Sequence, residues 1–411
     1  MTKKKSSIGL VNNKYNVIKL KDILGKNDSG NWGNNPSNVS YGVIRSVNFT
    51  NTGELVLNNV AKRSYLKERF QKIKLFKNDI IIERSGGSDN QPVGRVGFIN
   101  KDIENKNLGF ANFIQRIAVN EYDFYPKYIF YCLYRIYDMG ITNSMQKQTT
   151  GIRNLEYKYF LKSKLPKPNK STQKKIAMIL SIVDKNIEQT KKTIEKAERL
   201  KKSMMQNLLT GKIKPDGTKR REEDYCFDDK YGKVPVGWKV YKLKEIIKLK
   251  NGKGNTTNNL KKNIDDKYYI PVYGGNGITG YFYLPLLEET TLIIGRVGEY
   301  CGSVYKTPSE CWVTDNALYV SEFLIENYDI DLLKYILIKA NFNHYSDSTG
   351  QPKITQSGIG NIRVIIPIKK IEQIKIGRKL NFIQDFLNHK EIKIQKLGSL
   401  KKSLMQNLLT G

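Results

Sequence analysis

Apolar residues recur at alternating steps of four and three along two long stretches of this chain. The first stretch runs through Ile176, Leu180, Val183, Ile187, Thr190, Ile194, Ala197, Lys201, Met204 and Leu208. The second runs through Ile376, Leu380, Ile383, Leu387, Lys390, Ile394, Leu397, Lys401, Leu404 and Leu408. This spacing is a heptad seam, so each stretch predicts an amphipathic helix of about 40 residues and roughly 60 Å.

The two predicted helices are near-copies, set 200 residues apart. Residues 200–211 read LKKSMMQNLLTG and residues 400–411 read LKKSLMQNLLTG, identical at eleven of twelve positions. Both end in Thr-Gly, a helix stop signal, because glycine adopts the left-handed cap conformation at low cost. A lone amphipathic helix of this length would expose its apolar stripe, so we expect each to pack against the other. The alternative is two unrelated helices, each covering its own domain.

A globular segment precedes each helix, and the two segments share their order of motifs. Residues 15–24 (YNVIKLKDIL) have a twin at 238–247 (WKVYKLKEII). The repeating unit is therefore a domain followed by a long helix. We place a basic N-terminal arm at 1–13, expected to be disordered, and a first domain at 14–167 with its helix at 168–211. An extended linker follows at 212–237, then a second domain at 238–367 with its helix at 368–411.

Within each domain, short apolar runs predict strands, and Gly-rich loops interrupt them. Residues 80–82 (III) precede ERSGGSDNQP, and residues 292–294 (LII) precede GRVGEYCG at 295–302. Further strands are expected at 40–48, 93–99, 113–119 and 312–320, and helices at 125–137 and 330–340. Polar loops are expected at 148–155, 274–280 and 348–361.

Charge narrows the possible partners. Lys and Arg number 70 against 39 Asp and Glu, a formal net charge of +31, which predicts a polyanionic partner such as nucleic acid or an anionic membrane surface. No run of about 18 apolar residues predicts a membrane span, and no signal peptide is visible, so we expect a cytoplasmic protein. The four cysteines lack C-x-x-C spacing and are expected to be reduced.

Catalytic motifs are scarce. Two histidines, His344 and His389, leave little room for histidine catalysis or a histidine-rich metal site. There is no G-x-x-x-x-G-K-[ST] loop, no G-x-G-x-x-G in a βαβ setting, and 34–37 (NNPS) is not an N-P-P-[FY] motif. Asp79 and Glu83 could be forced into a nuclease-like pair, but a polar strand end is the simpler interpretation of Glu83.

The two glycine loops are the best candidates for DNA contact. Glycine lets the backbone approach a partner closely, and arginine can bind phosphate or a guanine edge; plain turn chemistry is the alternative. In the first domain the predicted contacts are Arg45, Asn48, Arg84, Ser85, Gly86, Gly87, Ser88, Gln91 and Arg95. In the second they are Lys253, Tyr273, Gly275, Asn276, Thr279, Arg296, Gly298, Tyr300, Thr314 and Asn316. A basic run, Lys62 to Lys77 around Tyr65 and Phe70, is equally a phosphate-binding flank or a solvated face.

These features together resemble the specificity (S) subunit of type I restriction-modification systems. The marks are the repeated LKKSxMQNLLTG, VPVGWKVYKLKEI at 234–246, IIGRVG with WVTDNAL, and the connector beginning KPDGT at 214–218. The first domain departs from the pattern, with Tyr15 in place of a P-x-G-W motif. The resemblance covers nearly the whole chain. It implies an α+β fold of two mixed α/β target recognition domains, whose long helices pair as an antiparallel coiled coil with pseudo-two-fold symmetry.

The resemblance also implies a function. The chain would be a non-catalytic DNA recognition subunit that reads a bipartite duplex site, one half per domain. Two methyltransferase (M) subunits would bind S-adenosylmethionine and methylate adenines, and ATP- and Mg-dependent restriction (R) subunits could join. No cofactor or metal is expected in this chain. The alternatives are a free-standing DNA-binding or architectural protein without enzyme partners, and an enzyme whose active site leaves no motif.

Overall fold

The computed structural model describes residues 4–88, 90–149, 152–254, 259–345 and 352–411. It divides into two compact units. The first unit comprises residues Met1–Thr190 and Lys393–Gly411, and the second comprises Lys191–Ile392. Each unit therefore combines a domain with parts of both long helices.

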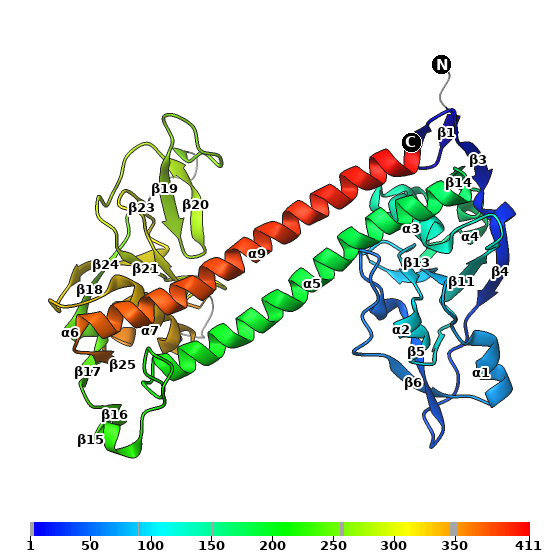
Figure 1. Ribbon diagram of the computed structural model, residues 1–411. Coiled ribbons are helices and arrows are strands. Elements are labelled where there is room, and N and C mark those ends of the chain that lie inside the picture. The colour runs from blue at the N-terminus through cyan, green and yellow to red at the C-terminus, as the bar shows by residue number, and fades with distance from the viewer. Residues whose placement is uncertain (1–3, 89, 150–151, 255–258, 346–351) are drawn as a thin grey trace. The chain divides into compact units, whose positions relative to one another are not determined.

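The two long helices form where the heptad pattern predicts them. Helix α5 spans Lys170–Leu208 and α9 spans Lys370–Thr410 (Figure 1). Every seam position predicted from the pattern is buried or half-buried, the polar ones included. Gly211 and Gly411 follow the helix ends with φ of 68° and 85°, the left-handed conformation expected of a stop signal.

Two sheets make up the domain of the first unit. An antiparallel sheet has the order β4-β11-β7-β9, and a mixed sheet has the order β10-β5-β6, with β10 and β5 parallel. Their bounds are β4 Leu24–Ser29, β5 Ser40–Ile44, β6 Ala61–Ser64, β7 Ile80–Glu83, β9 Val96–Phe98, β10 Leu108–Phe110 and β11 Ile114–Val119. A smaller sheet joins β12 Gln146–Thr149, β13 Ile152–Leu155 and β8 Ser85–Gly87, and β3 Asn16–Lys19 pairs with β14 Lys164–Lys167. The helices are α1 Lys67–Ile73, α2 Lys101–Glu104, α3 Pro126–Asp138 and α4 Tyr157–Phe160.

The domain of the second unit repeats the two larger sheets strand for strand. Its antiparallel sheet is β18-β24-β21-β22, and its mixed sheet is β23-β19-β20, with β19 and β23 parallel. The bounds are β18 Ile247–Asn251, β19 Ile270–Gly274, β20 Gly277–Phe282, β21 Leu292–Gly295, β22 Val304–Lys306, β23 Trp312–Val313 and β24 Ala317–Phe323. Strand β17 Trp238–Lys242 pairs with β25 Arg363–Pro367, and the helices are α6 Leu243–Ile246, α7 Ile330–Ala340 and α8 Gln356–Gly360. The single strand expected at 312–320 is two strands, broken by a loop at 314–316.

Each unit closes its core with the start of one long helix and the end of the other. In the first unit, Ile176 and Leu180 of α5 share a core with α3 and with Met405 and Leu409 of α9. In the second, Ile376 and Leu380 of α9 share a core with α7 and with Leu208 at the end of α5. The helix segments therefore run antiparallel within each unit, which confirms the expectation that each copy packs against the other.

A repeated glutamine fixes each domain to its own helix. The buried Gln173 side chain donates to Pro168 O and accepts from the backbone N–H of Tyr125, at 2.9 Å each. Gln373 does the same with Pro367 O at 2.7 Å and the N–H of Asp329 at 2.8 Å. These bonds anchor the starts of α3 and α7, and the heptad analysis did not identify them.

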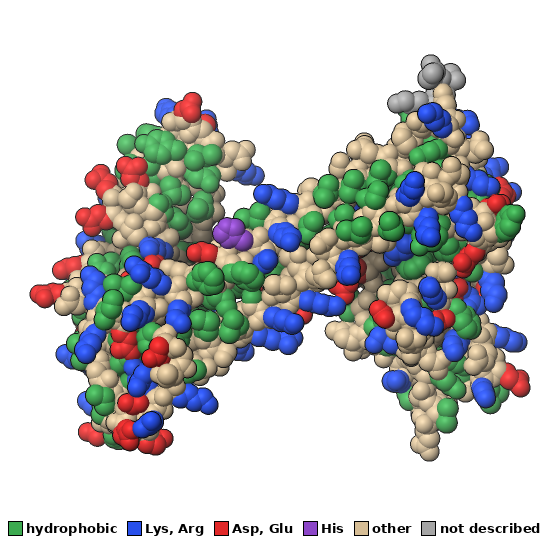
Figure 2. Space-filling view, viewed as in Figure 1, with side chains coloured by type: hydrophobic (Ala, Val, Ile, Leu, Met, Phe, Trp, Pro, Cys, Tyr) green, Lys and Arg blue, Asp and Glu red, His purple; other side chains and the backbone are tan. Residues whose placement is uncertain are grey.

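Basic side chains are the more numerous charged groups at the surface. On the face drawn in Figure 2, Lys and Arg are scattered widely and Asp and Glu are fewer, as the composition requires. This distribution is consistent with a polyanionic partner.

The N-terminal arm is ordered, so the expectation of disorder is wrong for the described residues 4–13. Strands β1 Lys4–Ser6 and β2 Gly9–Val11 form an antiparallel hairpin that buries Ile8 and Val11. The N–H of Asn12 donates to Thr410 O at 2.8 Å. The hairpin therefore packs on the end of α9, a contact across almost the whole sequence that local polarity could not reveal.

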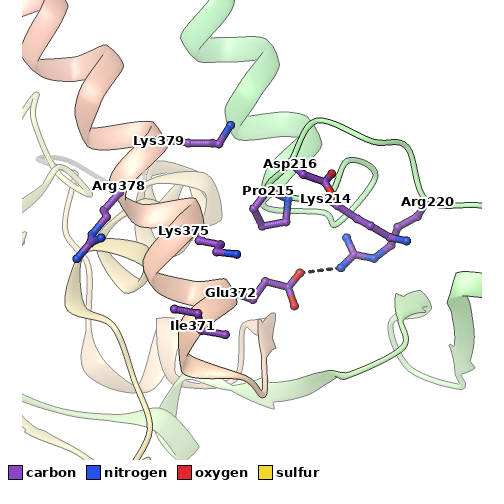
Figure 3. A pocket seen from close by; sticks show the side chains of 9 residues that line it. All are labelled: Lys214, Pro215, Asp216, Arg220, Ile371, Glu372, Lys375, Arg378 and Lys379. Carbon is purple, nitrogen blue, oxygen red and sulfur yellow. Dashed lines mark hydrogen bonds and ion pairs between the residues drawn. The ribbon is translucent and has the colours of Figure 1, made fainter.

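The linker is likewise folded and not extended. Strands β15 Tyr225–Asp228 and β16 Gly232–Pro235 form a second hairpin, which buries Val234. Upstream of it, Arg220 pairs with Glu372 of α9 at 2.7 Å and donates to Gly211 O at 2.9 Å (Figure 3). Glu372 also accepts from Trp238 Nε1 at 3.2 Å. Both hairpins thus cap a long helix, one at the end of α9 and one at the end of α5.

Candidate nucleic-acid interface

Two arginines occupy the same position in the two domains. Arg84 follows β7, and its N–H donates to Phe113 O while its carbonyl accepts from Leu155 N–H, both at 2.8 Å. Arg296 follows β21, and its N–H donates to Asn316 O while its carbonyl accepts from Ile354 N–H, both at 2.9 Å. The strand topology and these two bonds make the arginines structurally equivalent, which the pairing of the glycine loops anticipated.

In the first domain, the loop after Arg84 forms a narrow hairpin that presents its tip to solvent. Strand β8 pairs with β13, and Ser88 and Gln91 exchange backbone hydrogen bonds of 2.9 and 3.2 Å. Gly86 has a φ of 106°, and a Cβ on Gly87 would lie 2.8 Å from Gln91 O. Glycine is therefore required for this shape. Gly86, Ser88 and Gln91 are exposed, so their prediction as DNA contacts fits their placement.

Arg95 lies inside the domain and braces the loop. It is 3% exposed and donates to Glu83 Oε1 at 2.6 Å and Oε2 at 2.8 Å. It also donates to Phe49 O at 2.8 Å, Ser46 O at 3.1 Å and Gln91 Oε1 at 3.2 Å. Glu83 is the polar end of strand β7, as expected, but it is fully buried, and its burial raises its pKa against the opposing effect of Arg95. We therefore revise the expected role of Arg95 from DNA contact to support of the loop.

Asn48 is also a support. It is 1% exposed, and its amide donates to Val56 O at 2.8 Å and Asn59 O at 3.2 Å. Ser85 is buried, and its carbonyl accepts from Ser46 Oγ at 2.9 Å. These bonds join the 45–48 turn to the start of the loop that follows Arg84.

Arg84 and Arg45 keep part of their guanidinium groups at the surface. Arg84 Nη1 donates to Gln115 Oε1 at 3.1 Å and Ser29 Oγ at 3.3 Å, and its Nε has no partner. Arg45 Nη2 donates to Asn59 Oδ1 at 3.3 Å, and its Nε is also unpaired. Both unpaired Nε atoms are buried, and the assignment of the two arginines as DNA contacts stays a prediction.

In the second domain, three loops converge on one spot. A Cβ on Gly275 would lie 2.8 Å from Val297 O and 3.3 Å from Asn316 O, and one on Gly295 would lie 2.4 Å from Gly275 O. Lys253 joins them, since its N–H donates to Val313 O at 2.9 Å and its carbonyl accepts from Trp312 Nε1 at 3.1 Å. The sequence-predicted residues of this domain therefore come together from four separate segments.

Exposure divides these predicted contacts. Lys253, Asn276, Thr279, Tyr300 and Asn316 are exposed, and Arg296, Gly275 and Gly298 are half-buried. Tyr273 is 7% exposed and packs in a small core, where burial raises its pKa. Thr314 is buried, and its Oγ1 has no hydrogen-bond partner. The first eight remain predicted contacts, whereas Tyr273 and Thr314 sit beneath the loops.

Several other residues singled out in the first domain have contacts within the domain, whereas the role of the lysines in the basic run stays open. Tyr65 and Phe70 of the basic run belong to a core, and Arg63 stacks on Trp32 with 4.0 Å from its Cζ to the ring centre. Asp79 pairs with Arg116 at 3.5 Å, whereas Glu83 pairs with Arg95, so the two carboxylates face different arginines.

The described residues show no group of three or more His, Cys, Asp or Glu placed to hold a metal ion. All four cysteines are free thiols. Within the same residues, no helix is long and apolar enough to cross a membrane.

Known proteins share the sequence pattern and the fold of this chain. A family model described as the type I restriction modification DNA specificity domain matches residues 12–199 and 235–397. The specificity subunit of the type I restriction enzyme EcoprrI from Escherichia coli is 28% identical over 166 residues, 40% of this chain and 39% of that protein. The MjaVIII specificity subunit of Methanocaldococcus jannaschii is 24% identical over 322 residues, 68% of this chain and 69% of that protein. The crystal structure of a type I S subunit from M. genitalium, 17% identical, covers 99% of this chain and 100% of its own with a TM-score of 0.66, so the fold is shared.

Proposed function

Because this chain belongs to the family of type I restriction-modification DNA specificity proteins, we propose that its two domains read the two halves of one bipartite duplex site, one half each. Members of the family recognise DNA for partner enzyme subunits and are not catalysts themselves, and this chain shares that role.

The observation that carries the proposal is the equivalence of Arg84 and Arg296. Each arginine follows the equivalent strand of the same fold, is held by the equivalent pair of backbone bonds, and lies within two residues of a glycine. Two equivalent reading surfaces on one chain suit a site with two separate halves. Exposed loop residues with free donors can read base edges in the major groove, and the excess positive charge supplies phosphate contacts.

The proposal extends to partners and cofactors. Two methyltransferase subunits join this chain and bind S-adenosylmethionine, and each methylates an adenine in one half-site. Restriction subunits that use ATP and Mg²⁺ join the same assembly. Co-purification tests this part: the tagged chain should bring down a methyltransferase at about two per chain, whereas a free-standing DNA-binding protein would bring down none.

Half-site selectivity tests the central claim. We expect Arg84→Ala to relax or weaken recognition of one half only, and Arg296→Ala the other. A bidentate contact contributes about 1–3 kcal/mol of discrimination, so the affected half should lose roughly 5- to 150-fold in preference. Selection from a randomised duplex library, with methylation mapping in cells, measures both halves at once. Arg221→Ala is the matched control, because its side chain is 82% exposed and lies in the linker. Equal loss at both halves from one substitution would refute one domain per half.

A further inference from the structure

The lysines of the heptad seam, Lys401 in the first unit and Lys201 in the second, have different partners. In the first unit, Lys401 pairs with Asp184 at 2.7 Å, and Tyr131 donates its hydroxyl to the same carboxylate at 2.7 Å. Lys127 stacks on Phe98 and Phe130 nearby, at 4.2 and 4.3 Å from the ring centres. A half-buried carboxylate therefore neutralises the buried lysine of this seam.

The second unit lacks that carboxylate. Lys201, the equivalent of Lys401, donates to the side-chain oxygen of Gln384, and Gln384 stands 200 residues from Asp184. On α7, Lys334 donates to Asn381 Oδ1 at 2.8 Å and stacks on Tyr335 at 4.4 Å. Both ammonium groups thus face neutral amide oxygens. Among the residues that the structure describes, no carboxylate lies within 4.0 Å of either lysine.

These lysines line one cleft together with a third. The cleft has a volume of about 600 Å³, and Lys201, Lys306 and Lys334 open into it. Lys306 is paired with Asp331 at 2.8 Å, whereas Lys201 and Lys334 have no ion pair among the described residues. Burial lowers the pKa of Lys334, with Lys306 and Lys201 adding to the effect, while Asp331 and Asp385 oppose it. Burial also lowers the pKa of Lys201, opposed by Glu198. Such repulsion is relieved when an anion binds between the cations.

We propose that this cleft binds a phosphate group, and that DNA supplies it when the second domain engages its half-site. The same cleft is lined by Asn276 at the tip of the β19–β20 turn, one of the exposed residues predicted to contact DNA. A duplex held by Asn276 therefore brings its sugar-phosphate backbone to the lysines. This inference rests on the proposed function. The phosphate site belongs to the second unit alone, because in the first unit the carboxylate of Asp184 already pairs with the equivalent lysine.

The test replaces the missing carboxylate. Gln384→Glu places a negative charge against Lys201, as Asp184 does against Lys401, and Lys334→Gln removes one cation. Each phosphate contact contributes about 0.9 to the slope of log affinity against log salt. We expect either variant to lower the slope by about that amount. Between 50 and 200 mM salt, the wild-type chain should then lose about 3.5-fold more affinity than the variant. Half-site preference should stay unchanged, because phosphate contacts carry no base information.

Gln395→Glu is the matched control, since Gln395 is exposed on the same helix and the charge change is identical. Thermal unfolding of the variants checks that they fold. If Gln384→Glu behaves like Gln395→Glu on the duplex, the proposal is overturned. A second readout is the rate of Lys334 acetylation, which the duplex should slow. Protection by inorganic phosphate and not by duplex would overturn the assignment to DNA. Should the wild-type chain bind duplex with no salt dependence, the proposed function itself fails, a result distinct from either outcome above.

Discussion

Replacing Arg95 should destabilise the 84–95 loop of the first domain, although Arg95 is itself buried and not placed to contact DNA. Arg95→Met leaves the Glu83 carboxylate, Phe49 O and Ser46 O without their donor, all in a region where Arg95 is 3% and Glu83 0% exposed. Breaking a buried pair by removing one partner costs about 3–5 kcal/mol. Domains are stable by only about 5–15 kcal/mol, so this loss is large. We expect the opening free energy of β7 and β9, measured by amide hydrogen exchange, to fall by about that amount.

The effect should depend on pH with a definite sign. Burial already raises the pKa of Glu83 above 4.5, and Arg95 opposes the rise. Without Arg95 the pKa of Glu83 rises further, so the folded variant binds a proton that the unfolded chain releases near pH 4.5. Stability from this group is then present at low pH and lost as pH rises through the folded pKa. Arg95→Met should therefore be less destabilising near pH 5 than at pH 8.

Two controls separate support from DNA contact. Arg84→Met makes the same change in the same loop, but Arg84 is half-buried and its hydrogen-bond partners are the neutral side chains of Gln115 and Ser29. No buried charge loses its partner, so we expect less than about 1 kcal/mol of destabilisation. That variant should lose preference at one half-site instead. The double variant Glu83→Met with Arg95→Met should recover about 2 kcal/mol relative to Arg95→Met, because no charge remains buried. A stability change under about 0.5 kcal/mol in Arg95→Met, or no recovery in the double variant, would refute the supporting role of Arg95.

Two further predictions concern the long helices. A four-residue insertion between Thr190 and Ile194 adds about 6 Å of helix. If α5 sets the spacing of the half-sites, methylation mapping should show a gap longer by up to about two base pairs, with both half-sites unchanged. Altered half-sites would count against a role of the helix in setting the spacing. A fragment of residues 1–215 should form a homodimer, because Lys201, Met205 and Leu209 of a second copy can replace Lys401, Met405 and Leu409, and Asp184→Asn should weaken it by removing the partner of that lysine. Light scattering tests this, and a monomer at tens of micromolar would show that the two seams are not interchangeable.

The heptad periodicity predicted the positions of the two long helices, whereas contacts between residues distant in sequence were not predicted. The predicted bounds of α5 and α9 agree with the structure to within three residues, because burial along a helix repeats regularly. The hairpin at 4–11 was missed because its strands are three residues long and its partner, Thr410, lies at the far end of the chain. Lys201 and Lys401 were found as polar steps, but only the fold shows that one faces Gln384 and the other Asp184.

The predicted interface shows the same limit at the level of one loop. Arg84 and Arg95 flank the same glycines, and the residue type does not distinguish the half-buried arginine from the buried one. A usable signal existed, since Glu83 ends an apolar run of three isoleucines, where an unpaired carboxylate would be costly. A buried Glu calls for a cation, and Arg95 is the residue that returns along the neighbouring strand.

The way α9 completes the core of the first unit has a consequence during synthesis. Met405 and Leu409 are fully buried beside Ile176 and Leu180, yet they leave the ribosome about 200 residues after the first helix is finished. At about 5–20 residues per second this interval lasts roughly 10–40 s. Throughout it, the nascent first domain carries an open apolar groove that fits the tail of another copy's α5. Nascent chains on neighbouring ribosomes of one messenger would therefore be able to pair through α5 before their own α9 is made. Asp184 would not prevent this pairing, because its carboxylate can bind Lys201 of another copy in place of Lys401.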